Sequence, residues 1–506
     1  MNAFNMNKFR LQTVVTLCGL LTALPNFAEA VVVNFPDADL EAGVRTAIGK
    51  PTGDISDTDL VGTGFTSLSI DRTDLSDLSG LEYCTDLTTL YLYYNQITDI
   101  SELADLTNLT GIYMIGNQIS DITPLSGLVN LTELNLWGNP ISDISPLAGL
   151  TSLTDLSLGS NQISDISPVS GLTGLTRLYL SNNQISDISV VTGLTGLTSL
   201  SLSGNLISDI SPVAGLTNLT NLSLSDNGMS DISPVSGLAN LTTLRLSENS
   251  ISDIGPLAGL ANLRTLYLSS NRISDTSPLA NLTNLYFLDL SSNQITRISP
   301  LASLTELDHL YLSDNQIRDI SPLANLTKMY WLYLSGNSVR DVRPLAGLTG
   351  LNWLILRENP ITDINALVSN PGIGPSASWA DDWVDLTNTP LSQTALCTDV
   401  PILEGRGATV SVTRACGADA DGDELADEYE TWWGTDPNLR DTDHDGWGDY
   451  QEILVYSTDP LDPESPPEYT SVSATSLVGT IMLMAAMFAA GVFVLYWHRC
   501  GNDTSW

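Results

Sequence analysis

The chain has 506 residues and carries 58 acidic against 19 basic side chains, a formal net charge of −39 at pH 7. So large a negative charge disfavours nucleic acid and anionic lipid as partners, because both are negatively charged themselves. The three histidines, His309, His444 and His498, fall in three unrelated segments, and no glycine-rich phosphate loop is present. We therefore do not expect an enzyme.

Residues 1–30 have the order of a secretory signal. Lys8 and Arg10 precede an apolar run over 11–24, and small residues follow at 28–30. Basic, apolar and small residues in this order are typical of a cleaved export signal. We expect cleavage after residue 30 and an exported mature chain.

Residues 31–86 are expected to form an N-terminal cap and a degenerate first repeat. An amphipathic stretch, Leu40 to Ile48, is placed to cover that repeat. The degenerate copy runs from Leu68 to Leu81 and has Thr73 where an asparagine is due. Cys84 is expected to pack inside the first repeats, as free cysteines commonly do.

An asparagine returns every 22 residues through the next segment, 87–370, with no insertion or deletion. These residues are Asn95, Asn117, Asn139, Asn161, Asn183, Asn205, Asn227, Asn249, Asn271, Asn293, Asn315, Asn337 and Asn359. A fixed period of this length indicates one small unit stacked on itself, which is a solenoid.

The copy around Asn139 shows what each unit contains. Leu134 and Leu136 alternate with polar residues, which predicts a short strand with one buried face. Asn139 follows that strand, where its amide can satisfy the buried backbone groups of a turn. Ser145 and Pro146 then predict a helix N-cap and the first residue of a short helix or 3₁₀ turn.

An aspartate stands four residues after each ladder asparagine, from Asp99 to Asp363, interrupted only by Arg297. One interpretation is a cation-binding stripe. The other is that each aspartate accepts backbone hydrogen bonds in its own turn. Its presence in nearly every copy favours the second interpretation.

These repeats resemble those of bacterial leucine-rich-repeat proteins of the internalin type, which use SDS22-like 22-residue repeats. The resemblance covers roughly Val33 to Val412. It implies an α/β fold, a right-handed leucine-rich-repeat solenoid with a concave parallel β-sheet and short 3₁₀ or helical convex segments. It also implies recognition of a protein ligand on the concave face, commonly at a cell surface. A phosphatase-regulating scaffold of the same repeat class is the alternative, against which the export signal argues.

The variable strand positions lie six, four and two residues before each asparagine, and we expect them to form the concave face. Serine and glycine fill them in the middle copies, whereas aromatic residues replace them near both ends. Tryptophan, tyrosine and arginine are the usual anchors of interfaces, so we expect a protein or glycan ligand here. The alternative is ring stacking that serves stability alone. The candidate ligand-binding residues are Tyr267, Phe287, His309, Tyr311, Trp331, Tyr333, Trp353, Ile355 and Arg357, and in a second patch Tyr91, Tyr93, Tyr113 and Trp137.

Residues 371–416 are expected to close the array. An irregular last copy is predicted at Trp383 to Asn388, after a seven-residue insertion, and a closing strand within Ala408 to Val412. Cys397 and Cys416 bracket this segment, and we expect them to form a disulfide in an oxidising compartment.

Residues 417–456 contain two acidic copies that match a calcium-binding loop, with oxygen ligands at positions 1, 3, 5, 9 and 12 and a backbone carbonyl at position 7. The predicted ligands of the first copy are Asp419, Asp421, Asp423, Leu425, Asp427 and Glu430, and those of the second are Asp441, Asp443, Asp445, Trp447, Asp449 and Glu452. The second copy has Gly446 at position 6, whereas the first has Glu424 and should bind more weakly or depend on its neighbour. The pattern resembles thrombospondin type 3-like calcium repeats. We expect Ca²⁺ to order this segment as a stalk, the alternative being a solvated acidic linker.

The C-terminal part reads as a tether. A flexible linker is expected at 457–476, and residues 477–497 are uncharged. Twenty-one helical residues span about 31 Å, the thickness of a bilayer core. We expect a transmembrane helix there, with a short cytoplasmic tail at 498–506. The alternative is a sorting signal that is removed.

Overall fold

The computed structural model describes residues 30–62, 64–374, 382–413, 416–456 and 458–463. The predicted export signal (save its last residue), transmembrane helix and cytoplasmic tail lie outside these residues, as does most of the predicted linker. Among the described residues, every helix is too short or too polar to cross a bilayer. The chain divides into two compact units, Met1–Ile163 and Ser164–Trp506, which are described in turn.

The first unit begins with a capping helix, α2 (Ala38–Ile48). The carboxylate of Asp37 accepts hydrogen bonds from the amides of Asp39 and Leu40 and so starts the helix, and Gly49 ends it in the left-handed conformation. Helix α2 buries Leu40 and packs on the first strand, as expected of a cap. A short helix, α3 (Asp57–Leu60), follows.

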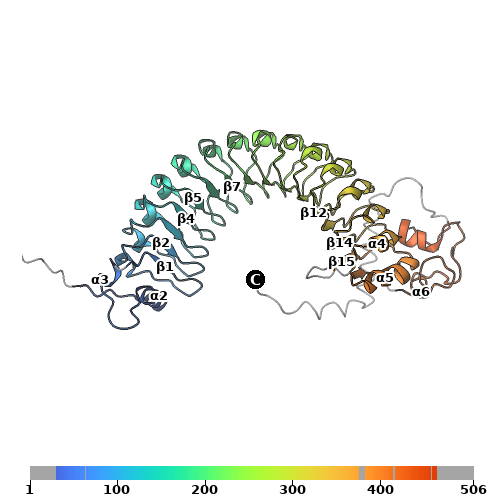
Figure 1. Ribbon diagram of the computed structural model, residues 1–506, viewed down its shortest axis with the longest axis horizontal. Coiled ribbons are helices and arrows are strands. Elements are labelled where there is room, and N and C mark those ends of the chain that lie inside the picture. The colour runs from blue at the N-terminus through green and yellow to red at the C-terminus, as the bar shows by residue number, and fades with distance from the viewer. Residues whose placement is uncertain (1–29, 63, 375–381, 414–415, 457, 464–506) are drawn as a thin grey trace, which may run out of the picture. The chain divides into compact units, whose positions relative to one another are not determined.

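The first unit then forms a solenoid. Its strands pair in parallel and in chain order, and each pairing advances by one repeat, so that Leu68, Leu90 and Ile112 lie in one buried row. In each unit the strands line one side of the coils and the 3₁₀ segments the other (Figure 1). The elements are β1 (Ser67–Ser69), η1 (Leu81–Tyr83), β2 (Thr89–Tyr91), η2 (Ser101–Leu103), β3 (Gly111–Tyr113), η3 (Thr123–Gly127), β4 (Glu133–Asn135), η4 (Ser145–Gly149) and β5 (Asp155–Ser157).

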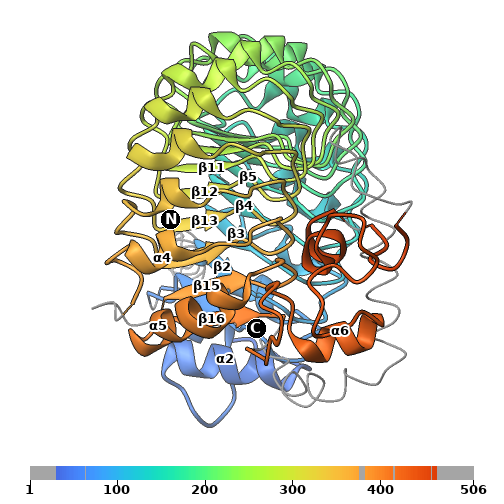
Figure 2. The same cartoon turned by 90° about the vertical axis from the view of Figure 1, so that its right-hand side faces the viewer.

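The second unit repeats the same architecture, and Figure 2 shows β11, β12 and β13 side by side in chain order. Its strands are β6 (Arg177–Tyr179), β7 (Ser199–Ser201), β8 (Asn221–Ser223), β9 (Thr243–Arg245), β10 (Thr265–Tyr267), β11 (Phe287–Asp289), β12 (His309–Tyr311), β13 (Trp331–Tyr333), β14 (Trp353–Ile355), β15 (Trp383–Leu386) and β16 (Thr409–Val412). The 3₁₀ segments are η5 (Ser167–Gly171), η6 (Ser189–Gly193), η7 (Ser211–Val213), η8 (Ser233–Gly237), η9 (Gly255–Leu257), η10 (Ser277–Asn281), η11 (Ser299–Ser303), η12 (Ser321–Asn325) and η13 (Arg343–Leu345). The remaining helices are α4 (Asn365–Ser369), α5 (Val400–Gly405) and α6 (Asp427–Trp433), with π-helical segments η14 (Ala395–Asp399) and η15 (Gln451–Tyr456).

Most of the ladder asparagines are buried, and their side chains join neighbouring repeats. The Nδ2 group of Asn139 donates to the carbonyl of Leu136 in its own turn and to that of Met114 in the preceding repeat, both at 3.0 Å. Its Oδ1 atom accepts from the amide of Ile119, also in the preceding repeat, at 3.0 Å. Asn293 makes the equivalent three bonds in the second unit. The predicted role in the turn is confirmed, and the amide also connects each copy to the one before it.

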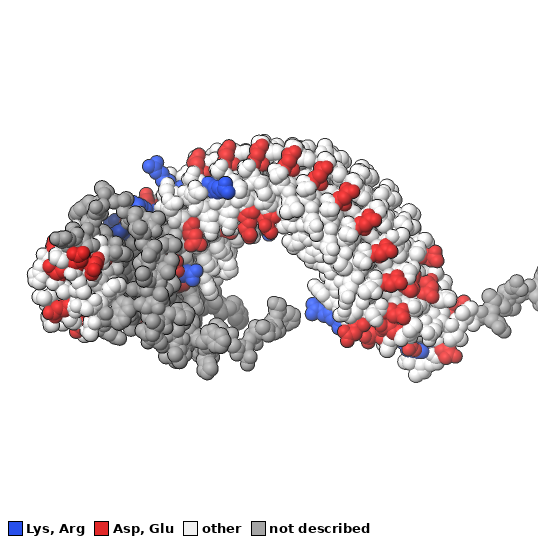
Figure 3. All heavy atoms as spheres, turned by 180° about the vertical axis from the view of Figure 1, so that it is seen from behind, with Lys and Arg blue, Asp and Glu red and all other residues white. Residues whose placement is uncertain are grey.

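The aspartate column is structural, as the repeat pattern favoured. Asp143 Oδ1 accepts from the amide of Ser145 at 2.8 Å, and these bonds hold the pKa of Asp143 below its usual range despite repulsion from Asp121. Figure 3 shows the acidic side chains recurring in a regular row. The prediction that Ser145 caps the following helix is wrong: Ile144 occupies the cap position without a side-chain bond, and Asp143 satisfies the amide of Ser145 instead.

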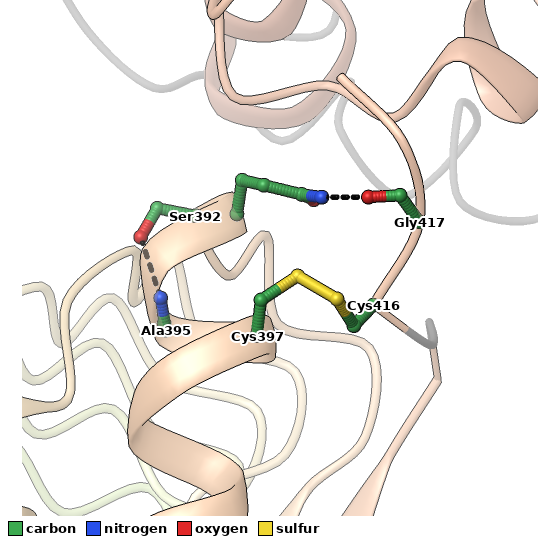
Figure 4. The surroundings of a disulfide bond; sticks show 6 residues. Ser392, Ala395, Cys397, Cys416 and Gly417 are labelled. Atoms are coloured by element: carbon green, nitrogen blue, oxygen red, sulfur yellow. Dashed lines mark hydrogen bonds between the residues drawn. A yellow bond between two sulfur atoms is a disulfide. The ribbon is translucent and has the colours of Figure 1, made fainter.

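The C-terminal end of the array is closed as predicted. Strand β15 pairs with β14 and β16 pairs with β15, all in parallel. Cys397 and Cys416 form a disulfide with their Cα atoms 4.9 Å apart (Figure 4). Beside it, the side-chain amide of Gln393 donates to the carbonyl of Gly417. The acidic segment therefore leaves the cap at a covalently fixed point.

Candidate functional site

A run of neighbouring aromatic rings covers the solvent-facing side of the sheet in the second unit, from β10 to β15. Because paired residues follow the strand register, the rings form two columns. Phe287, His309, Trp331, Trp353 and Trp383 occupy one column, and Tyr311 and Tyr333 the other, with Tyr267 meeting Phe287 diagonally. The ring centroids are 4.6 Å apart for Tyr267 and Phe287, 5.3 Å for Phe287 and Tyr311, 4.5 Å for Tyr311 and Tyr333, 4.5 Å for His309 and Trp331, 6.5 Å for Trp331 and Trp353, and 5.4 Å for Trp353 and Trp383. We call these eight residues the aromatic stripe.

The rings of the aromatic stripe are half-buried, since each covers part of its neighbour. Ile355 differs from the expectation: it is only 8% exposed, so it packs with the sheet and offers little surface to a ligand. Arg357 is exposed at the same end. The guanidinium of Arg245 lies 4.7 Å from the centroid of the Tyr267 ring, at the opposite end.

Trp383 belongs to the aromatic stripe although its position in the repeat did not reveal it. The residue six before Asn388 is Asp382, but Trp353 pairs with Trp383, because the insertion shifts the register by one residue. The only sequence feature that could have assigned Trp383 to the aromatic stripe was that it is aromatic. Tyr286, exposed next to β11, was missed because it lies outside the three strand positions.

Burial shifts the pKa of several side chains of the aromatic stripe. Burial, with the charge of Asp289 and the nearby phenols, raises the pKa of Tyr311 to about 12. Burial also raises the pKa of Tyr333 and lowers that of His309, whose Nδ1 contacts the carboxylate of Asp308. A ligand would therefore meet rings, phenol hydroxyls and the imidazole of His309.

The second aromatic patch lies in the first unit. Tyr91 and Tyr113 stack with centroids 4.8 Å apart, and Tyr93 meets Tyr113 edge-on at 6.4 Å. The hydroxyl of Tyr113 is hydrogen-bonded to Glu133, and burial together with this bond raises the pKa of Tyr113. Trp137 lies over Gly159, where even a Cβ would overlap the indole. The structure brings the three tyrosines together.

The strands between Tyr179 and Tyr267 carry small residues and form a shallow groove. Ser201, Ser223 and Arg245 lie along it. Arg245 is the basic side chain that lines this groove. It stands four residues before Asn249, at a variable strand position, but it was missed because the selection followed the aromatic residues.

Two acidic loops follow the disulfide, and each wraps its backbone around its carboxylates. In the first loop Asp419 accepts from the amides of Gly422 and Glu424. In the second, Asp441 accepts from His444 and Gly446 in the same way. Glu424 has a φ of 81° and Gly446 a φ of 98°, so the first loop places a non-glycine residue where glycine is favoured.

Three groups of carboxylates in these loops are close enough to hold an ion, each with its oxygens within 4.8 Å of one another. They are Asp419 with Asp421 and Asp423, Asp423 with Glu430 and Asp449, and Asp441 with Asp443 and Asp445. Asp427 stands outside them, and its Oδ1 accepts from the amide of Ala420 at 2.7 Å. Leu425 packs its side chain in a small core with Tyr450 and Ile453.

Four of these carboxylates, those of Asp423, Glu430, Asp449 and Glu452, are buried. Burial, reinforced by neighbouring carboxylates, raises the pKa of Glu430 to about 8, that of Glu452 to about 7 and that of Asp423 to about 6. Several of their oxygens have no hydrogen-bond partner among the described residues, including both of Glu430. A cation relieves such a charge, and a donor set made of oxygen alone suits Ca²⁺. These clusters are thus able to bind ions.

The stacked 22-residue units and the open sheet face define a leucine-rich-repeat binding protein. A family profile described as Leucine Rich repeats (2 copies) matches residues 85–127, 107–149, 129–171, 173–215, 217–259, 239–281, 261–303 and 283–325. The crystal structure of an internalin (InlF) from Listeria monocytogenes is 40% identical, over 64% of this chain and 96% of that one, with a TM-score of 0.62. The chain belongs to the internalin-type leucine-rich-repeat proteins, a family of binding proteins and not of enzymes.

Two further solved structures share the fold. The functional domain of InlJ from Listeria monocytogenes is 24% identical over 75% of this chain and 81% of that one, with a TM-score of 0.64. A leucine-rich-repeat protein of Leptospira interrogans, LIC12759, is 24% identical over 68% of this chain and 83% of that one, with a TM-score of 0.54. No curated protein matches the chain.

Proposed function

We propose that this chain is a cell-surface recognition protein that binds a protein ligand on the aromatic stripe of its second unit. The observation that carries the proposal is an unbroken run of half-exposed rings in contact with one another over six consecutive strands, β10 to β15. Large rings held in place by neighbours lose little freedom on binding, which is why such residues anchor interfaces. Membership of the internalin-type family supports a binding role.

Stability alone does not account for the rings. Strands β7, β8 and β9 pair in the same register and bury Leu200, Leu222 and Leu244 equally well, yet they carry mainly serine, asparagine and threonine on the outer face. The repeat therefore folds without aromatic residues at these positions. The rings of β10 to β15 are an addition to the scaffold.

A protein is favoured over a glycan by the way the rings are presented. Tyr311 and Tyr333 are inclined by only 18°, and Trp353 and Trp383 by 10°, so the rings of these two pairs cover each other's faces. His309 meets Trp331 edge-on, at 67°. A sugar ring packs on an open aromatic face, whereas protein side chains also fit ring edges and hydroxyls. The exposed Arg357 adds a charged contact at the end of the aromatic stripe.

The proposed setting is extracellular. Export by residues 1–30, anchoring by residues 477–497 and a Ca²⁺-ordered stalk at 417–456 would present the repeats of 87–370 outside the membrane. The order of residues in the two terminal segments and the buried carboxylates of the stalk support this arrangement. A C-terminal tag tests the anchor: it should stay with the membrane, whereas its loss from the mature protein would indicate a removed sorting signal.

The test of the main proposal uses the full chain in detergent, probed against arrays of purified cell-surface proteins and of glycans. Trp331→Ala with Trp353→Ala should abolish capture of the protein that the wild type binds. The matched control, Tyr91→Ala with Tyr113→Ala, removes two stacked rings from the other patch and should leave capture intact. Loss in the control alone would move the site to the first unit, and capture confined to the glycan array would contradict a protein ligand.

A further inference from the structure

The carboxylate of Glu430, in the first acidic loop, lies close to a carboxylate of the second loop. Glu430 is the last ligand position of the first loop, is fully buried, and has no hydrogen-bond partner on either carboxylate oxygen among the described residues. It forms a group with Asp423, from the same loop, and Asp449, from the second loop. One oxygen of each of the three residues lies within 4.8 Å of the others.

Asp423 and Asp449 also accept hydrogen bonds from backbone amides and a hydroxyl outside this group. Asp423 accepts from the amides of Leu425 at 2.7 Å and Tyr450 at 3.2 Å. Asp449 accepts from the amide of Thr442 at 2.9 Å and from its hydroxyl at 2.6 Å. Hydrogen bonds of this kind favour the ionised carboxylate, so the arrangement concentrates negative charge around Glu430.

The spacing matches a calcium ion. Calcium binds oxygen ligands at about 2.3–2.6 Å, so two ligands on opposite sides of the ion lie about 4.6–5.2 Å apart. Carboxylate oxygens within 4.8 Å of one another fit around one such ion. Three buried carboxylates at this distance repel one another strongly when no cation is bound.

We propose that the calcium site of the first loop is completed by Asp449 of the second loop, which joins Asp423 and Glu430 as a ligand. The inference rests on the proposed calcium binding of residues 417–456 and adds that the two loops share one site. The first loop thus gains a ligand from the second loop. This ligand offsets the loss of calcium affinity expected from Glu424, which stands where glycine is favoured. Calcium at this site fastens one loop to the other.

The shared site is joined to the C-terminal cap through Tyr450, which follows Asp449. The Tyr450 amide donates to Asp423, and its hydroxyl donates to the carbonyl of Pro390 in the cap. Its ring lies in the small core with Leu425 and Ile453. Calcium at the shared site therefore also holds the acidic segment against the end of the repeats.

The experiment uses the full chain in detergent and measures calcium affinity by isothermal titration. The second loop's own group is first disabled by Asp443→Asn with Asp445→Asn, so that the remaining affinity reports the first loop. Adding Asp449→Asn should weaken that affinity by about tenfold or more, because a charged ligand is lost. The control is Glu404→Gln, which removes an exposed carboxylate of helix α5, outside both loops, and it should change the affinity by less than about threefold.

Glu430→Gln removes the central charge at nearly unchanged volume, and it should reproduce the loss seen with Asp449→Asn if that variant fails to fold. Unchanged affinity in both variants overturns the shared site while leaving calcium binding in place. The shared site is also overturned if the wild type binds calcium and the Asp443→Asn, Asp445→Asn chain does not. A wild type that binds no calcium contradicts the proposed calcium-ordered stalk itself.

Discussion

The indole rings of Trp353 and Trp383 stack almost in parallel, 10° apart in plane and 5.4 Å apart in centroid, although 30 residues separate them in an array that otherwise repeats every 22. The structure accommodates the insertion before β15 so that this strand still places a ring next to Trp353. The aromatic stripe therefore continues as far as β15, the strand before the closing strand β16.

Trp383→Ala should therefore weaken ligand capture about as strongly as Trp353→Ala. The unfolding free energy should fall by more than the roughly 0.5–1.5 kcal/mol assigned to a ring pair, because buried ring area is lost as well. Array binding and urea denaturation measure the two effects. Tyr179→Ala, which removes a half-buried sheet-face ring outside the aromatic stripe, is the control and should leave capture unchanged.

Asn293→Ala should destabilise the repeats by about 2–5 kcal/mol, because it leaves two carbonyls and one amide of the chain without their partners. Urea denaturation followed by circular dichroism is the measurement. The control is Asn284→Ala, which removes one exposed bond to the carbonyl of Ala261 and should cost less than about 1 kcal/mol. An equal decrease of the unfolding free energy in the two variants would show that the ladder asparagines stabilise the repeats no more than an exposed asparagine does.

The aspartate column should make the repeats more stable at neutral than at acidic pH. Turn hydrogen bonds lower the pKa of several column members in the folded state, so their stabilisation is complete above the unfolded pKa, near 3.8, and is lost as the pH falls through the lower folded value. These members are Asp121, Asp143, Asp187, Asp231, Asp275, Asp319 and Asp341.

The stability difference between the wild type and a chain with Asp143→Ala, Asp187→Ala and Asp231→Ala should therefore be largest near pH 7 and shrink below the ordinary pKa of 3.8. Melting temperatures across this pH range provide the test. Arg297→Ala, at the one column position without a carboxylate, should show no such pH dependence. A difference that stays constant down to low pH would rule out this contribution.

Removal of calcium should loosen the acidic segment and spare the repeats. With a chelator present, the buried carboxylates around Glu430 and Glu452 lose their counter-charge and repel one another. Limited proteolysis with mass spectrometry should then find new cleavage within residues 417–456, with the region 87–370 as resistant as before. Equal cleavage with and without chelator would contradict a calcium-ordered stalk.

The repeats were predictable because each fold-determining residue returns at a constant spacing. The burial of Leu134 and Leu136, the role of Asn139 and the closing strand at Thr409–Val412 are all confirmed. Ser145 was misassigned as a cap because serine followed by proline is common there, and the competing bond from Asp143 depends on turn geometry.

Parts of the candidate sites were not predictable, because they depend on neighbours that the repeat does not specify. Trp383 escaped position counting through a one-residue shift of register. The burial of Ile355 depends on what surrounds it in the folded sheet. The sequence allowed the first acidic loop to depend on its neighbour but did not indicate through which residue. Asp449 lies with the carboxylates of Asp423 and Glu430, a proximity that only the fold creates.

The side-chain amides of the ladder asparagines connect the repeats in one direction, each to the repeat before it. Asn293 satisfies backbone groups of the repeat before it, so each repeat needs the asparagine of the next repeat. The segment that can be added or deleted without disturbing the solenoid is therefore one whole 22-residue repeat. A duplication of 22 residues would insert one strand and its outer-face positions in register. The reach of the recognition surface can thus change by recombination in whole steps, while every existing copy keeps the neighbours it needs.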